Sequence, residues 1–302
     1  MTHLRIPILL GTHLVGIALL LASGASWGYP QNPPPDGKKD QPEKETPATD
    51  AEKETRRVSE QLISGIDLEI LTDDKWIKVK RIEKPLLLYG DYTRENDRGS
   101  LWGWGEKGRP VALLELFQDT SNRTKWIFCI SNTSGRTLRA TRGGVPWWKE
   151  NDSDVELKSL PQAPTPAADA MQRQRQVRLL AQKFSGHEFW NPNNSRYELR
   201  RIERPLYTYR DEASGVLEGA LFTFANGTNP EIMLFVEARV DPKDKSKASW
   251  HYVVGRSSDA ELRLEYSGNE VFKAPRSDLP SDPEKPYWGG KLNTISELQR
   301  DK

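Results

Sequence analysis

The sequence is poor in the residues on which most catalytic and metal centres depend. Its 302 residues include one cysteine, Cys129, and four histidines. A single cysteine excludes an intrachain disulfide framework and a cysteine-rich zinc or iron–sulfur site. Charge of one sign is not in excess either, because 44 lysines and arginines accompany 43 aspartates and glutamates. We therefore expect no cofactor, no metal and no nucleic-acid partner.

Long hydrophobic runs are also scarce, and the one that is present lies at the N-terminus, from Ile6 to Ala22. It follows Arg5 and precedes the small residues Ser23 to Ser26, which is the order of a secretory signal. We expect a signal peptide over 1–28, a periplasmic or secreted protein, and no membrane span after cleavage. The alternative is an uncleaved N-terminal helix that anchors the chain.

Two segments of linker composition divide the remainder. Residues 29–54 carry three consecutive prolines and mixed charges but few apolar side chains, which predicts a disordered linker. A second break is marked by Pro161, Pro164 and Pro166. The breaks predict one α+β module over 55–162, a second over 163–290, and a tail over 291–302.

An internal repeat links the two predicted modules. The segment from Arg81 to Leu86, RIEKPL, returns 120 residues later as RIERPL, from Arg201 to Leu206. After four extra residues in the second copy, the match resumes at an offset of 124 with Trp126 and Trp250. Other pairs at the offset of 120 are Tyr89/Tyr209, Asp91/Asp211, Gly99/Gly219, Trp102/Phe222 and Trp104/Phe224. The repeat therefore predicts that the chain contains two copies of one module.

Periodicity predicts the elements inside each copy. Apolar residues from Ile232 to Val240 alternate with Glu237 and Arg239, as in a strand with one buried face. The pair Asn226-Gly227 is typical of a tight hairpin, so neighbouring strands should be antiparallel. Helices are expected over about 51–63 and from Thr165 to Gly186, the latter with Val177, Leu180, Ala181 and Phe184 on one face.

The predicted fold class is α+β, with tandem duplicated modules. Each is a helix followed by a curved antiparallel sheet of four to five strands, an outline similar to cystatin and to nuclear-transport-factor-2-like domains. A Gly-x-Gly-x-x-Gly pattern at Gly103–Gly108 is not interpreted as a nucleotide site, because the strand-like segment from Val111 to Phe117 follows where a helix would be needed.

Candidate acid–base residues are few. Glu83 and Asp91 recur as Glu203 and Asp211, and two carboxylates suffice for a glycosidase. The competing interpretation is that Arg81 and Arg201 form surface ion pairs with these glutamates. His187 is a further acid–base candidate, although no ligand spacing beside it indicates a metal. A hydrolase would use Glu203, Asp211 and His187.

The ten tryptophans raise the alternative of an aromatic binding surface. Trp102, Trp104 and Trp126 align with aromatic residues of the second copy, which favours a role in the core. Trp147, Tyr287 and Trp288 have no such counterpart. These three are the predicted binding residues.

Several segments carry a resemblance to a known group of proteins. They are GSLWGW from Gly99, GRPVA from Gly108, RLLAQKFS from Arg178, GALF from Gly219 and GTNPE from Gly227. Over residues 55 to 275 the chain resembles a family of uncharacterised exported bacterial proteins, for which no activity is known. The resemblance implies a bacterial, extracytoplasmic setting. We expect a non-enzymatic module that binds a protein or glycan at the cell envelope; the alternative is a carboxylate-dependent hydrolase acting on an envelope polymer.

Overall fold

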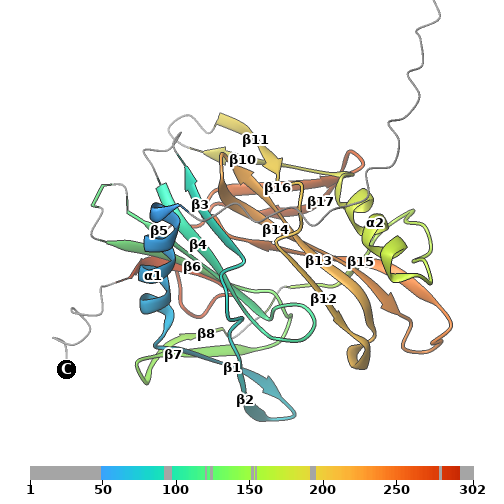
Figure 1. The fold of residues 1–302 in the computed structure, drawn as a ribbon, viewed down its shortest axis with the longest axis horizontal. Helices are drawn as coiled ribbons and strands as arrows, with labels where there is room; N and C mark the ends of the chain where they lie inside the picture. Colours follow the sequence, from blue (N-terminus) through green and yellow to red (C-terminus); the bar gives the residue numbers. More distant parts are fainter. Residues whose placement is uncertain are drawn as a thin grey trace, which may run out of the picture. The chain divides into compact units, whose positions relative to one another are not determined.

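The structure is a computed structural model that describes residues 49–91, 97–119, 121–122, 125–150, 153, 155–190, 195–278 and 281–292. The predicted signal peptide, most of the predicted linker and most of the predicted tail lie outside these residues. Antiparallel strands dominate the described chain, together with the α-helices α1 (Asp50–Ile63) and α2 (Ala170–Ala181) (Figure 1). The mixed α and β composition and the antiparallel pairing are confirmed. In the described residues, no helix has the length and apolar character needed to cross a bilayer.

Helix α1 begins earlier than the predicted linker allows. The Thr49 side chain accepts a hydrogen bond from the Glu52 backbone N–H, and the Glu52 carboxylate accepts one from the Thr49 N–H. This reciprocal capping box satisfies two backbone donors that a helix start leaves unpaired. Residues 50–54, which the prediction assigned to the linker, thus form the start of α1.

The strands of the first half of the chain, up to β8, lie in two antiparallel sheets. One has four strands, in the order β2 (Lys75–Val79), β1 (Ile66–Thr72), β7 (Leu138–Arg142) and β8 (Val145–Lys149). The other has five, in the order β18 (Tyr287–Leu292), β6 (Trp126–Asn132), β5 (Ala112–Gln118), β4 (Asp97–Trp104) and β3 (Leu87–Asp91). The Gly103–Gly108 segment is the end of β4 and the turn that leads into β5.

The second half forms a nine-stranded antiparallel sheet. Its order is β17 (Asn269–Ala274), β16 (Glu261–Tyr266), β10 (Phe184–Trp190), β11 (Ser195–Arg201), β13 (Val216–Asn226), β14 (Asn229–Val240), β15 (Ala248–Arg256) and β9 (Lys158–Ser159), while β12 (Tyr207–Asp211) also pairs with β13. The halves do not share a sheet, apart from the edge strands described below. Both halves have more strands than the four to five predicted.

Helix α2 is shorter at both ends than the sequence indicates. Asp169, rather than Thr165, caps it, and its carboxylate accepts from the Gln172 N–H. Phe184 and Gly186 belong to β10, where a Cβ on Gly186 would lie 3.3 Å from side-chain atoms of Ile232 and Phe224. Glycine here allows the strand to approach the core closely, and it does not end the helix.

The halves exchange edge strands. Strand β9 leaves the first half and pairs with β15 of the second, and β18 returns from the second half to pair with β6 of the first. Leu160, just after β9, and Leu292, at the end of β18, are both buried against the half that receives them. Both edge strands therefore pair across the predicted boundaries at 162 and 290.

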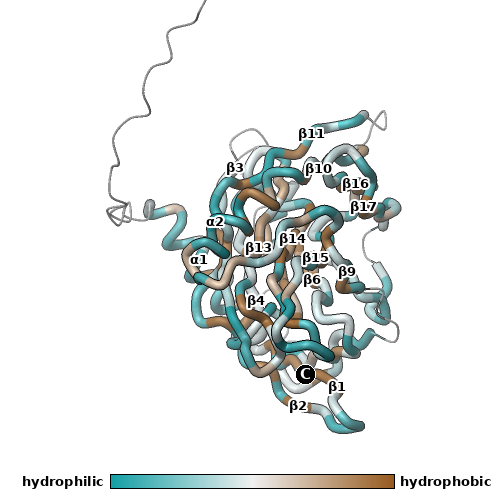
Figure 2. Tube along the Cα trace, turned by 90° about the vertical axis from the view of Figure 1, so that its right-hand side faces the viewer, coloured by the Kyte–Doolittle hydropathy of each residue, from teal (hydrophilic) through white to brown (hydrophobic). Residues whose placement is uncertain are grey.

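Three apolar cores follow from this arrangement. One lies in the second half beneath α2, and another lies in the first half, where it includes Trp102, Trp104 and Trp126 as predicted. The third joins Leu101 and Leu113 of the first half to Leu221, Met233 and Phe235 of the second. In Figure 2 the hydrophobic colour is concentrated on sheet strands such as β13 and β14. Strand β14 is thus buried on both faces, and the prediction of a single buried face is wrong.

Residues 120 apart make matching contacts in the two halves. The N–H groups of Ile82 and Ile202 donate to the carbonyls of Gly103 and Thr223. In the same way, the N–H groups of Leu86 and Leu206 donate to the carbonyls of Leu101 and Leu221, both at 2.7 Å. Tyr89 pairs with Gly99 across β3 and β4, and Tyr209 pairs with Gly219 across β12 and β13.

Candidate functional site

The carboxylates proposed for hydrolysis lie in different settings. Glu203 is exposed, and Asp211 is half-buried at the end of β12. The Asp211 carboxylate accepts hydrogen bonds from the backbone N–H and hydroxyl of Ser214, so it caps the short 3-10 turn Glu212–Ser214. Asp91, its repeat counterpart, ends β3. Neither Glu203 nor Asp211 lines a cavity described below.

His187 lies inside a sheet and not after a helix. It is a buried residue of β10, and its ring packs edge-on against Phe189 with centroids 5.5 Å apart. Burial lowers the pKa of His187, which keeps the imidazole neutral. Among the described residues, no group of three His, Cys, Asp or Glu side chains could hold a metal.

The expected ion pairs between the repeated arginines and glutamates are also absent from the described residues. Arg81 instead places its guanidinium 4.9 Å from the centroid of the Trp102 ring. Arg201 lies 5.7 Å from the Phe222 ring in the same way. Burial lowers the pKa of both arginines. Both arginines thus make a cation–π contact at matching positions, and Arg201 also donates to the carbonyls of Ile202 and Glu203.

Two of the three predicted binding aromatics do come together. The rings of Trp147 and Trp288 have centroids 4.8 Å apart, and Phe128 lies 4.8 Å from the first and 4.6 Å from the second. The residues come from β8, β18 and β6. Both tryptophans are half-buried against the core of the first half, so much of each ring is used in packing.

Tyr287, the third, is buried and not exposed. Its hydroxyl donates to Cys129 Sγ at 3.2 Å, and the Arg256 guanidinium lies 4.5 Å from its ring centroid. Burial raises the pKa of Tyr287 and of Cys129, so both groups stay protonated at neutral pH. A reactive cysteine thiolate would require the opposite shift.

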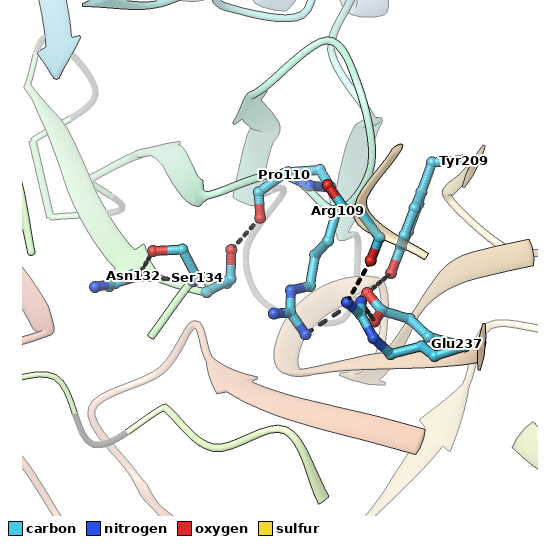
Figure 3. A network of polar contacts seen from close by, with 9 residues as sticks. Arg109, Pro110, Asn132, Ser134, Tyr209 and Glu237 are labelled. Atoms are coloured by element: carbon cyan, nitrogen blue, oxygen red, sulfur yellow. Dashed lines mark hydrogen bonds and ion pairs between the residues drawn. The ribbon is translucent and has the colours of Figure 1, made fainter. Parts of the chain in front are cut away.

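A buried polar network joins the halves (Figure 3). Glu237, on β14, is fully buried, and its carboxylate accepts from the Tyr209 hydroxyl at 2.8 Å and from Arg239 at 2.8 Å. Arg109, from the turn between β4 and β5, extends from the first half to within 3.6 Å of the same carboxylate. Burial of Tyr209, and the nearby Glu237, raise its pKa well above the usual range.

A second polar link is centred on Glu115 of β5. Its buried carboxylate accepts from the Tyr89 hydroxyl at 2.5 Å on one oxygen and from the Ser257 hydroxyl at 2.5 Å on the other. Since Ser257 belongs to the second half, this carboxylate also connects the halves. The two tyrosines occupy matching positions, but the two glutamates do not. The buried carboxylates of Glu115 and Glu237 therefore both have structural partners.

Beside this interface lies a cavity of about 570 Å³, which falls within the range of small-ligand sites. It is lined by the ends of β6 and β15, by β17, and by the connection that leads to β18. Its apolar wall contains Val155, Val254, Phe272 and Tyr287. A smaller cavity of about 240 Å³ lies between α1 and β3, beside Tyr89 and Arg98.

Cationic side chains predominate around the larger cavity. Arg256, Lys273, Arg276 and Lys285 line it, against Asp278 and Asp282, an excess of two positive charges. Asp278 is 95% exposed and lies 3.6 Å from Arg276, and the Asp282 carboxylate accepts from the Glu284 N–H. Arg256 donates to the carbonyls of Ser258, Pro275 and Ala260, which fixes its guanidinium at the edge of the cavity.

Sequence reasoning identified Tyr287 but missed the other residues of this region. Arg109 lies in a segment that was interpreted from its glycines, and Glu237 lies in one that was interpreted from its strand periodicity. No local pattern predicted a contact between them. One signal was available: Met233 and Phe235 make the run from Ile232 to Val236 continuously apolar, which is typical of a strand buried on both faces.

Comparison with known proteins gives no relatives: no family model, no curated protein and no solved structure matches the chain.

Proposed function

We propose that this is a non-enzymatic binding protein of the bacterial cell envelope whose partner occupies the cavity at the junction of its halves. The observation that carries the proposal is the composition of that cavity. It combines an apolar wall, Phe272 and Tyr287 among its residues, with a rim on which positive charge exceeds negative. A ligand with an apolar body and a negative charge is complementary to both features.

The alternative, a carboxylate-dependent hydrolase of an envelope glycan or polymer, has less support. Its proposed residues Glu203 and Asp211 are exposed or used to cap a turn. The two carboxylates at the cavity are those of Asp278, beside Arg276, and Asp282, which accepts from a backbone N–H. Each of these four carboxylates is thus exposed or already used in a local contact.

We infer further that the halves are two copies of one helix-and-sheet module, as the repeated segments suggest. Matching backbone bonds from Leu86 and Leu206, and matching Arg81–Trp102 and Arg201–Phe222 contacts, support this origin. The resemblance to exported bacterial proteins and the N-terminal pattern support export with cleavage near residue 28. N-terminal sequencing of the protein recovered from a bacterial periplasm would test export; a chain that keeps residues 1–28 would indicate the anchored alternative.

The binding proposal can be tested with 8-anilinonaphthalene-1-sulfonate, an apolar anion that fluoresces in apolar sites. We expect saturable binding of one dye molecule per chain. The charge-reversed pair Lys273→Glu with Lys285→Glu should weaken it at least about tenfold. The matched control reverses two lysines that do not line the cavity, Lys75→Glu with Lys183→Glu. Equal dye affinity in the two double variants would contradict the proposed site.

A further inference from the structure

We propose that the cavity receives an extended, acidic segment of a partner protein, which adds a strand to the free edge of β15 at Val254. The inference rests on the proposed binding function and narrows the partner from any apolar anion to a peptide. It follows from the backbone of β15, the course of the chain before β9, and the charges around the cavity.

Strand β15 forms many more backbone pairs on one of its edges than on the other. Strand β14 pairs with it from Ala248 to Arg256, whereas β9 pairs only with His251 and Tyr252. The equivalent edge strand of the first half, β18, pairs with six successive residues of β6. Among the described residues, no strand therefore forms backbone pairs with β15 beyond Tyr252 on the β9 side, although the Ser131 side chain of β6 reaches Arg256. An uncovered strand edge is the surface to which extended peptides add.

The outward backbone groups of Val254 lie at the cavity. On the β9 side, the Leu160 N–H donates to the Trp250 carbonyl at 2.8 Å. Because backbone groups alternate along an antiparallel strand, those of Val254 and Arg256 point the same way as those of Trp250. The Arg256 carbonyl accepts from the Ser131 hydroxyl, in agreement with this direction. No described residue bonds to the Val254 N–H or carbonyl there, and Val254 lines the cavity.

The chain itself turns away from this edge. If β9 continued towards its N-terminal side with the same register, Glu156 would lie opposite Val254. Instead, the carbonyl of Val155 lies against Gly135, where an added Cβ would be only 2.7 Å from that oxygen. The residues before β9 therefore leave the edge of β15, and the cavity there is lined by Val155 and Val254.

The side chains around this edge favour the binding of an acidic peptide. Alternate residues of an added strand would face the apolar wall, which contains Phe272 and Tyr287, and the rim, which contains Lys273 and Lys285. A second copy of this chain, pairing β15 with β15, would bring the same lysines and arginines together and would be opposed by charge repulsion. A partner with acidic residues is therefore favoured over self-association.

The test uses fluorescein-labelled acetyl-Val-Glu-Val-Glu-Val-Glu-amide as the probe, followed by fluorescence anisotropy with the full chain. We expect binding, with the Val-Lys peptide at least about tenfold weaker. Val254→Pro removes the outward N–H without removing a bond to β14, and an edge strand tolerates proline. It should weaken binding about tenfold, whereas Val254→Thr, which keeps the N–H and the side-chain shape, should not.

A second measurement on the peptide covers the case in which Val254→Pro does not fold. Two versions of the acidic peptide, N-methylated on either set of alternate residues, should differ in affinity, because only one set of N–H groups faces β15. Equal affinity of the two versions, or of Val254→Pro and Val254→Thr, would overturn strand addition. Dye binding without peptide binding would overturn the peptide inference alone, whereas loss of both would overturn the proposed function.

Discussion

Arg109, in the first half of the chain, places its guanidinium 3.6 Å from the buried carboxylate of Glu237 in the second half. The carboxylate also accepts from Tyr209 and Arg239, so it is neutralised by one cation from each half. Removing one partner of a buried ion pair leaves an uncompensated charge, which is more costly than losing an exposed pair. The contact therefore makes the stability of each half depend on the other.

Loss of the Arg109 cation should destabilise the whole protein. We expect Arg109→Met, which keeps most of the side-chain volume, to lower the free energy of unfolding by about 3 kcal/mol. The matched control is Arg196→Met, whose partner Glu198 is 66% exposed, and there the loss should stay under about 1 kcal/mol. Urea unfolding followed by tryptophan fluorescence measures both. Similar losses in the two variants would contradict a structural role for the Arg109–Glu237 contact.

The hydroxyl of Tyr209 should contribute separately to this network. Tyr209→Phe removes one donor from a buried carboxylate, so we expect a loss of about 2 kcal/mol in the free energy of unfolding. Tyr207→Phe is the control, because that half-buried ring has no hydroxyl partner among the described residues; its effect should lie within about 0.5 kcal/mol. If the two variants unfold at the same urea concentration, the Tyr209–Glu237 bond does not stabilise the fold.

The glycines opposite the repeated tyrosines are predicted to be irreplaceable. A Cβ on Gly219 would lie 2.2 Å from the Tyr209 ring, and one on Gly99 would lie 2.3 Å from the Tyr89 ring. Gly219→Ala should therefore cost about 3 kcal/mol. At Gly90, where an added Cβ meets nothing within 4 Å, alanine should be neutral or slightly stabilising. Thermal melts of the two variants compare these outcomes directly.

The tyrosine–glycine pairs show how far the sequence could be read. Tyr89/Tyr209 and Gly99/Gly219 stood out as a repeat, and antiparallel pairing with buried tryptophans could be predicted from periodicity. The structural role of these repeated residues could not be predicted, because the packing of a tyrosine ring over a glycine depends on the strand register. Likewise, the contact of Arg109 with Glu237 joins residues 128 positions apart (237 − 109). Local patterns carry no information about such pairs.

Lowering the pH should destabilise the protein, because the imidazole of His187 is buried. Burial first, and then the charge of Arg196, lower the pKa of His187 in the folded state. The unfolded chain therefore binds the proton more readily, so the stability contributed by the neutral imidazole is complete above the unfolded value of about 6.5 and falls as the pH drops below it. Unfolding in urea at pH 8 and pH 5 should show a smaller change for His187→Gln than for the natural chain. An identical pH dependence would show that other groups account for it.

The exchanged edge strand β18 should be required to keep the first half folded and the edge of its sheet covered. A chain that ends at Pro286 lacks β18, loses the buried Tyr287 and Leu292, and leaves the edge of β6 unpaired. We expect a melting temperature lowered by at least about 5 °C and self-association through the open edge, both measurable by calorimetry and size-exclusion chromatography. The matched control ends at Leu292, which keeps every residue of β18 and should behave as the full chain does. If the chain ending at Pro286 matched that control in both measurements, β18 would not contribute to the stability of the first half. Binding of a partner in the cavity, whose wall includes Tyr287, would then not depend on β18.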